Sequence, residues 1–244
     1  MHNDSAPNCG EGCSATPDLR GEYSVNIFSD EVVRRVHQHA STRTPWFIYA
    51  AYQSVHEPLQ APASYALRYN STPGFASWNK GQRTIAMMLS ALDDGIRNIT
   101  AALDATAQTG NTLVVLSADN GGTGASSNWP LRGGKHSVYE GGVRGAAFVT
   151  GPLVPPSARG TVSTQVICTW LSVSIAISCT SSLLELADVC ALQMAHAADW
   201  LPTFVRLAGG STVGNTLPLD GIDQWASIAV GEAVILLTLP PQSY

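Results

Sequence analysis

An acid and an amide follow directly on an apolar run in the middle of the chain. Residues 113–118 read LVVLSA, and Asp119, Asn120, Gly121 and Gly122 come next. Carboxylate and amide oxygens are the ligands that calcium and magnesium prefer, and glycines allow a tight turn or a close backbone approach. The order predicts a hard-cation site at the end of a strand. An Asx turn that closes a strand would use the same residue types.

A second candidate lies in residues 128–145, NWPLRGGKHSVYEGGVRG. This stretch places Lys135 among glycines and four other ionisable side chains (Arg132, His136, Glu140 and Arg144). A lysine ammonium beside a divalent cation would neutralise a tetrahedral oxyanion such as sulfate or phosphate. A solvated basic loop is the alternative interpretation.

His56 is the third candidate, in QSVHEPLQAP just after the apolar run 46–52. A histidine at the carboxyl end of a strand can bind an anion or donate a proton to a leaving group. The alternative is a loop histidine that does neither.

Helices and strands in alternation are predicted to position these residues. The stretch 31–40, capped by Asp30, has the pattern of a short helix, and 46–52 (WFIYAAY) has that of a buried strand. The strongest helix pattern covers 82–107, with Gly110 as its stop. Its apolar residues recur at helical spacing (Ile85, Met88, Leu89, Leu92, Ile96, Ile99 and Leu103).

Two further strands are predicted at 112–118 and 146–151. Strands that alternate with helices are typical of a parallel α/β sheet. Ligands of such sheets bind at the carboxyl ends of the strands, which is where Asp119 and His56 are expected.

Composition limits the classes of protein that the chain can represent. Its 244 residues are 45% hydrophobic, enough for one substantial core. The net charge is −5, and lysine and arginine form no cluster, which argues against a nucleic-acid-binding protein.

Cysteines and sequons indicate the secretory pathway, but the first residues contain no signal peptide. The five cysteines are an odd number, and Cys9 and Cys13 are close enough for a small disulfide loop or a metal clip (the others are Cys168, Cys179 and Cys190). Glycosylation sequons begin at Asn3, Asn70 and Asn98. The stretch MHNDSAPNCGEGC has neither a basic nor an apolar region, so we expect the true start to be missing.

Four blocks of the sequence resemble successive blocks of the sulfatases, and arylsulfatase B most. They are WFIYAAYQSVHEPLQAP, LSADNGG, NWPLRGGKHSVYEGGVRG and ADWLPTFVRLAGG, in the family's order, and the likeness covers most of 18–230. The resemblance implies an alkaline-phosphatase-like α/β fold with a large, mostly parallel sheet between helices. It also implies calcium, a formylglycine made from cysteine, sulfate-ester hydrolysis, and a lysosomal or secreted protein.

The same resemblance assigns roles to single residues. Asp119 and Asn120 are similar to two calcium ligands of the family, and Lys135 and His56 are similar to residues that contact the sulfate. Glu140 and Arg144 match a block for which we expect a structural role, as an internal ion pair or loop brace.

The sequence also departs from the family pattern. The family's nucleophile lies in Cys-x-Pro-x-Arg, whereas Cys13 begins CSATPDLR and Cys9 begins CGEGC. Two further aspartate ligands, another lysine and another histidine of the family also have no counterpart. We therefore expect a partial catalytic domain over 18–230, after an irregular segment over 1–17 and before an aberrant tail over 231–244.

Residues 166–193 are predicted to be an insertion that the family lacks. The segment contains no lysine or arginine, and its valine and glutamine borders are compatible with the GT and AG ends of an intron. A retained intron is the preferred interpretation. Serines and threonines dilute its apolar residues, so no membrane span is predicted.

Two classes of function follow. The first is a sulfuric ester hydrolase that acts on a sulfated small molecule or glycan, with glycosaminoglycan sugars as candidates, and that is inactive as the 244-residue chain stands. The second is a non-catalytic sulfatase-like protein that binds calcium or sulfated glycans. A related phosphatase is a weaker third, and no oligomeric state is predicted.

Overall fold

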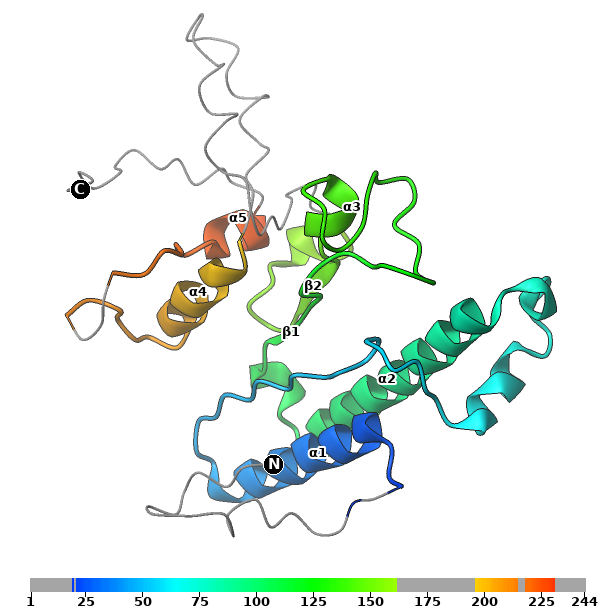
Figure 1. The fold of residues 1–244 in the computed structure, drawn as a ribbon. Helices are drawn as coiled ribbons and strands as arrows, with labels where there is room; N and C mark the ends of the chain where they lie inside the picture. Colours follow the sequence, from blue (N-terminus) through cyan, green and yellow to red (C-terminus); the bar gives the residue numbers. More distant parts are fainter. Residues whose placement is uncertain (1–18, 20, 162–195, 215–217, 231–244) are drawn as a thin grey trace, which may run out of the picture. The chain divides into compact units, whose positions relative to one another are not determined.

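Two long helices dominate the first of the two units into which the chain divides. The computed structural model describes residues 19, 21–161, 196–214 and 218–230 (Figure 1). The units are 1–108 and 109–244, and each is described by itself. All five cysteines, Asn3, the segments 1–17 and 166–193, and the tail 231–244 lie outside the described residues.

Helices α1 (Ser24–Thr42) and α2 (Lys80–Ala105) pack against each other, as the blue and green helices of Figure 1 show. Gly95 of α2 lies at their contact. A methyl group at Gly95 would overlap the Ser29 hydroxyl and would lie 3.4 Å from Val25 Cγ1. The missing side chain therefore lets the two helix backbones approach closely.

Helix α1 begins seven residues before the predicted stretch 31–40, so the prediction that Asp30 caps it is wrong. Val25, Ser29 and Val36 are all buried on this helix. Positions four and eleven residues apart share one helical face, and burial of that face explains the earlier start.

The predicted helix 82–107 is confirmed with shifted ends. Asn79 caps its first turn, because Asn79 Oδ1 accepts the Gln82 amide at 2.9 Å and Gln82 Oε1 accepts the Asn79 amide at 3.1 Å. The helix ends at Ala105, so Gly110 is not its stop. The chain leaves the helix at Thr106 and Ala107, whose φ is 56°.

Residues 46–52 were predicted to form a buried strand, and this prediction is wrong. The segment is extended, but it has no strand partner among the described residues. Exposed and half-buried residues alternate along it, with Phe47 at 71% and Tyr49 at 84% exposure. The half-buried side chains attach it to α1, since the Tyr52 hydroxyl lies 2.9 Å from Ser29 Oγ.

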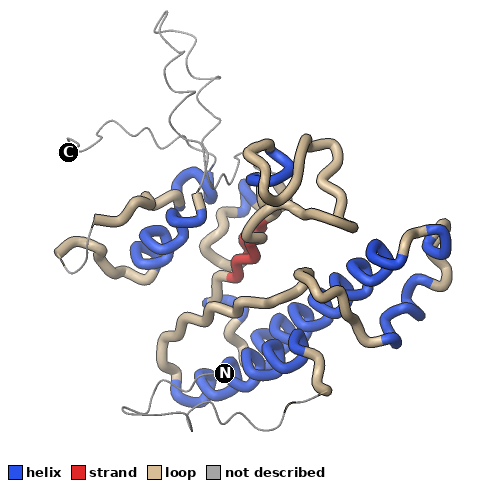
Figure 2. Tube along the Cα trace, in the orientation of Figure 1, coloured by secondary structure: helices blue, strands red, loops and turns tan. Residues whose placement is uncertain are grey.

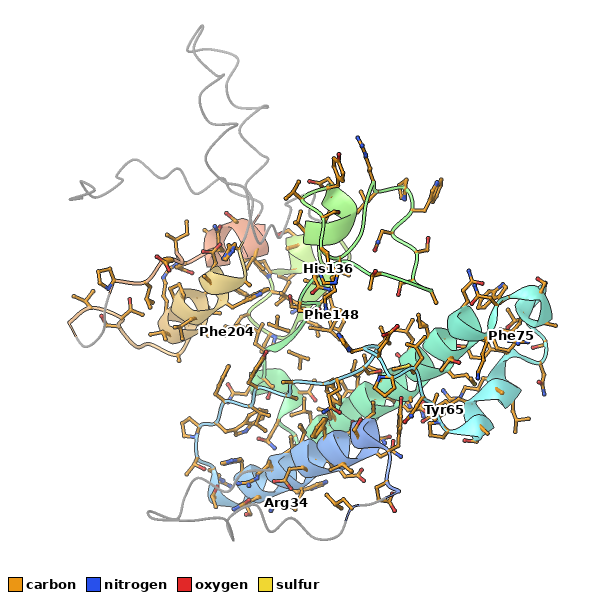
Figure 3. The ribbon with its side chains drawn as sticks, in the orientation of Figure 1. Arg34, Tyr65, Phe75, His136, Phe148 and Phe204 are labelled. Carbon is orange, nitrogen blue, oxygen red and sulfur yellow. The ribbon has the colours of Figure 1, made fainter. Side chains whose placement is uncertain are left out.

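A loop with two 3-10 helices, η2 (Ala63–Tyr69) and η3 (Phe75–Ser77), leads into α2. Tyr65 and Phe75 mark this loop in Figure 3. The rings of Tyr69 and Phe75 stack at 4.6 Å between centroids, and the Tyr69 hydroxyl donates to the Ala86 carbonyl at 2.7 Å. These contacts fix the loop on α2.

Strands β1 (Val114–Ser117) and β2 (Ala147–Thr150) form the sheet of the second unit, red in Figure 2. They pair antiparallel, with Val114 opposite Thr150 and Ser117 opposite Ala147. The sequence predicted both strands, but the parallel arrangement is wrong for this pair. The connection between them contains only loops and the short helix α3 (Glu140–Val143). Because the strands are antiparallel, it leaves β1 and enters β2 at the same end of the pair.

The rest of the second unit includes η4 (Thr109–Asn111), η5 (Pro156–Ala158), η6 (Ala197–Asp199), α4 (Trp200–Leu207) and α5 (Trp225–Val230). Asp199 is buried, and its carboxylate accepts the amides of His196 at 2.6 Å and Ile222 at 2.8 Å. It therefore ties the start of α4 to the segment before α5. Among the described residues, no helix is both long and apolar enough to span a bilayer.

Candidate functional site

The first part of the candidate site is the loop that follows β1. We call residues 119–122 the acidic loop. Asp119 is exposed, and its Oδ1 accepts the Asn120 amide at 2.8 Å. Asn120 is half-buried, and its Nδ2 donates to the Gly121 carbonyl at 2.9 Å. Both hydrogen bonds reach only the next residue, whereas the side-chain oxygen of an Asx turn accepts the amide two residues further on.

The same geometry fits part of a calcium site. Because Nδ2 of Asn120 is directed to a carbonyl, its amide oxygen lies on the opposite side as an acceptor. Asp119 and Asn120 together supply carboxylate and amide oxygens, the donors of a hard cation. They account for only part of the six to eight oxygens that calcium takes. Within the described residues, no cluster of three or more His, Cys, Asp or Glu side chains could hold a metal ion.

Glycines let a second stretch of backbone approach the acidic loop. The Gly121 amide donates to the Gly142 carbonyl at 2.9 Å, and the Gly141 amide donates to the Arg132 carbonyl at 2.8 Å. A methyl group on Gly121 would overlap the Gly141 carbonyl, and one on Gly141 would overlap the Gly133 carbonyl. The stretches 121–122, 132–133 and 141–142 can pack this closely only because no Cβ atom lies between them.

The loop that carries the candidate lysine lies beside the acidic loop. We call residues 132–136 the lysine loop; His136, which has a φ of 76°, marks it in Figure 3. The Lys135 amide donates to the Gly122 carbonyl at 3.1 Å, and Lys135 is half-buried. The structure therefore brings Lys135 next to the loop of Asp119 and Asn120.

Asn128 links the two loops, and the sequence did not single it out. Its Oδ1 accepts the Gly122 amide at 2.8 Å, and its Nδ2 donates to the carbonyls of Gly122 at 2.8 Å and Gly133 at 3.1 Å. The one feature of the sequence that could have pointed to Asn128 is its position as the first residue of the block NWPLRGGK, which also contains Lys135.

Other contacts stabilise the flank of the lysine loop. The Arg132 guanidinium lies 4.0 Å from the centre of the Tyr139 ring, a cation–π contact. Glu140 and Arg144 form the expected ion pair at 3.7 Å, but their side chains are 48% and 37% exposed. The pair is therefore at the surface rather than internal, where such pairs contribute little to stability.

His56 belongs to the first unit, whereas Asp119, Asn120 and Lys135 belong to the second. It is exposed, and its Nδ1 lies 2.9 Å from the Glu57 carbonyl. A carbonyl only accepts, so Nδ1 is the donor and carries a proton. Its amide donates to the Gln53 carbonyl at 2.8 Å, which closes a turn after the extended segment 46–52.

Comparison with solved structures defines the class of protein. The crystal structure of Ps i-CgsB matches 86% of this chain and 39% of its own, with a TM-score of 0.65 and 28% identity. A structure of the same protein in complex with k-i-k-neocarrahexaose matches equally well. The protein yidJ from Bacteroides fragilis shares the fold with a TM-score of 0.59 at 15% identity, over 86% of this chain and 42% of its own. The expected alkaline-phosphatase-like fold class is confirmed.

The chain belongs to the sulfatase family, because the family model named Sulfatase matches residues 1–189. It is 35% identical over 234 residues to arylsulfatase J of Mus musculus, across 93% of this chain and 33% of that protein. It is 27% identical to N-acetylgalactosamine-6-sulfatase of Sus scrofa, across 54% of this chain and 24% of that protein. The chain thus spans about a third or less of the length of these two relatives.

Proposed function

We propose that the full-length protein containing this chain is a sulfuric ester hydrolase. The observation that carries the proposal is the 3.1 Å hydrogen bond from the Lys135 amide to the Gly122 carbonyl, which joins a cationic residue to the acidic loop. In this proposal a cation held by the acidic loop and the Lys135 ammonium act together on a tetrahedral, negatively charged sulfate. Membership of the sulfatase family supports the same reaction.

In this proposal two residues bind the cation and two act on the sulfate ester. Asp119 and Asn120 hold calcium through their side-chain oxygens, and a bound calcium ion would withdraw charge from the sulfate oxygens. Lys135 orients the sulfate and neutralises the charge that grows as the ester bond breaks. His56 binds the sulfate or donates a proton to the departing alcohol.

The formylglycine of the family does not fit the residues of this chain. None of the five cysteines has proline two residues later and arginine four residues later. No catalytic step is therefore assigned to any of them. A polypeptide of these 244 residues should show no sulfate-ester turnover. A chromogenic aryl sulfate, incubated with the chain and a formylglycine-generating enzyme, tests this. Saturable, metal-dependent release of the phenol that is absent from Asp119→Ala would contradict it.

Sulfated glycans are the proposed substrate class. Two relatives support this class: one structure holds k-i-k-neocarrahexaose, an oligosaccharide, and another relative is an N-acetylgalactosamine-6-sulfatase. Both point to sulfated sugars, and glycosaminoglycan sugars are the proposed form. Release of sulfate from defined sulfated oligosaccharides by the full-length protein would distinguish them from simple aryl sulfates.

A lysosomal or secreted location is part of the same proposal. Asn70 and Asn98 begin two of the sequons, and both are exposed in the structure. Exposed sequons are compatible with glycosylation in the secretory pathway. A mass decrease after treatment with a peptide N-glycosidase, lost when Asn3, Asn70 and Asn98 are all replaced by Gln, would support this location.

Three substitutions separate the proposed roles in the full-length protein. Asp119→Ala should weaken calcium binding and slow turnover, because a carboxylate ligand is lost. Lys135→Ala or His56→Ala should leave calcium binding intact and lower kcat by roughly a hundredfold, because charge in the transition state is stabilised less. Calorimetric calcium titration beside steady-state kinetics measures both effects. If Lys135→Ala abolished calcium binding and Asp119→Ala did not, the assignment would be wrong.

The absent cysteine motif favours a second function for the 244-residue chain itself, that of a non-catalytic protein that binds calcium or a sulfated glycan. Calcium binding by the isolated chain, lost in Asp119→Ala and without any turnover, would support this second function.

A further inference from the structure

The carbonyl oxygen of Gly122 accepts two hydrogen bonds from different sources. One comes from the Lys135 amide at 3.1 Å, and the other comes from Asn128 Nδ2 at 2.8 Å. The acidic loop, the lysine loop and Asn128 therefore meet at one atom. Since a carbonyl has two lone pairs, these two donors satisfy it fully.

The partners of Asn128 also fix which way its amide points. Its oxygen faces the Gly122 N–H, and its NH₂ group faces the carbonyls of Gly122 and Gly133. Rotation of the amide by half a turn would set an oxygen against two carbonyl oxygens and a donor against a donor. A side chain with a donor and an acceptor at this length is needed, and aspartate offers acceptors only.

We infer that Asn128 is a positioning residue for sulfate-ester hydrolysis, which holds the lysine loop, and Lys135 with it, against the acidic loop. The inference rests on the proposed function for the roles of Lys135 and Asp119. Its physical basis is the link from Gly122 to Gly133, two residues before Lys135. A shift of the lysine by about 1 Å is enough to cost up to a hundredfold in rate.

The substitution Asn128→Asp separates the two halves of the link. Aspartate has nearly the same shape and still accepts the Gly122 amide, but it replaces the donor to the two carbonyls with an acceptor. In Asn128→Asp, the Gly122 amide should keep its protection from hydrogen exchange, and the Lys135 amide should exchange about tenfold faster or more. In Asn128→Ala, both amides should lose protection.

Ser127→Ala is the matched control. Its hydroxyl accepts only the Trp129 amide, at 3.3 Å, among the hydrogen bonds described for this loop, and it contacts neither the acidic loop nor the lysine loop through them. The Ser127→Ala substitution should leave the hydrogen-exchange rate of the Lys135 amide unchanged. Exchange at Lys135 that is equally slow in the native chain, Asn128→Asp and Asn128→Ala would overturn the inference.

Kinetics of the full-length, calcium-loaded protein test the catalytic part. Asn128→Asp should lower kcat/KM for an aryl sulfate by about ten- to a hundredfold. In a Lys135→Ala background the same change should cost less than about twofold, because a residue that acts through Lys135 has nothing left to position. An equal cost in both backgrounds would show a purely structural role and overturn the inference. If Lys135→Ala alone left kcat/KM unchanged, the proposed function would fail, while the exchange result would still decide whether Asn128 holds the loop.

Discussion

Segments of chain pack closely both in the helix pair of the first unit and in the two loops of the second unit. The helices make contact through side chains, whereas the loops make contact through backbone atoms. Helices α1 and α2 pack through side chains, and a single glycine, Gly95, admits the Ser29 hydroxyl. The acidic loop meets its neighbours through backbone, as in the hydrogen bond from Gly121 to Gly142.

This difference indicates how much each region tolerates an added side chain. At Gly95 the obstacle is a hydroxyl that can rotate, whereas at Gly121 it is the Gly141 carbonyl, which moves only with the chain. An added methyl group should therefore destabilise the helix pair less than it destabilises the loops. Four predictions follow, from the largest expected effect to the smallest. The first two test this contrast, and the other two test contacts that stabilise the helix pair.

Gly121→Ala should cause the largest loss. Its Cβ would overlap a backbone carbonyl, so the strands and loops of 114–150 should lose about 3 kcal/mol of local stability. Hydrogen exchange resolved by residue measures this loss, and α1 and α2 should keep their protection. Gly110→Ala is the control, because a Cβ there meets nothing within 4 Å. Equal effects of the two substitutions would refute the backbone-packing explanation.

Gly95→Ala should cost about 1–2 kcal/mol of the free energy of unfolding of the helix pair, because the new methyl group displaces the Ser29 hydroxyl. That hydroxyl now lies 2.7 Å from the Val25 carbonyl and 2.9 Å from the Tyr52 hydroxyl. Adding Ser29→Ala should recover part of the loss, since the overlapping atom is removed. Urea unfolding of the single and double variants measures this coupling. No recovery in the double variant would mean that the helix backbones, rather than the hydroxyl, resist the methyl group.

Asn79→Ala should cost about 1 kcal/mol, because it removes the side chain that accepts the Gln82 amide at the start of α2. The loss should appear as faster exchange in the first turn of α2, with no change in the acidic loop. Asn79→Ser should restore most of the protection, since serine is also a good helix cap. If alanine and serine behaved alike, the capping contact would contribute nothing measurable.

The smallest expected effect is a loss of stability in acid, when Glu31 on α1 is protonated and its ion pairs are lost. Hydrogen bonds from Arg34, and then from Arg35, lower the pKa of Glu31 to about 2 from its ordinary 4.5. A lowered pKa stabilises the fold above pH 4.5, and this contribution fades as the pH falls from there toward 2. Because Arg34 and Arg35 are about half exposed, the effect should stay below about 1 kcal/mol.

Glu31→Gln provides the comparison for this pH effect. Unfolding free energies of both proteins are measured from pH 5 to pH 2 at low salt. The variant should lose less stability than the native chain as the pH falls from 4.5 toward 2. High salt should reduce the difference between the two proteins, because exposed charges are screened. An unchanged pH profile in Glu31→Gln would show that the pairs do not stabilise α1.

Local patterns in the sequence were sufficient for several elements. The helical spacing of apolar residues predicted α2, and the apolar runs predicted β1 and β2. The four sequence blocks predicted the family, which the comparisons bear out. Asp119, Asn120, Lys135 and His56 stay predictions as site residues.

Tertiary contacts decided the features that these patterns missed. Helix α1 starts at Ser24 because Val25 and Ser29 are buried, and burial depends on α2, which lies far along the chain. Residues 46–52 have the composition of a strand, but a strand also needs a hydrogen-bonded neighbour, and composition does not specify one.

By itself the sequence determined which residue types follow β1 and which glycines lie near Lys135, because those facts depend on order along the chain. The tertiary structure alone decided that β1 and β2 run antiparallel and that Asn128 joins Gly122 to Gly133. The physical reason is distance. A hydrogen bond depends on where two backbones meet in space, and no spacing along the sequence specifies that meeting before the chain folds.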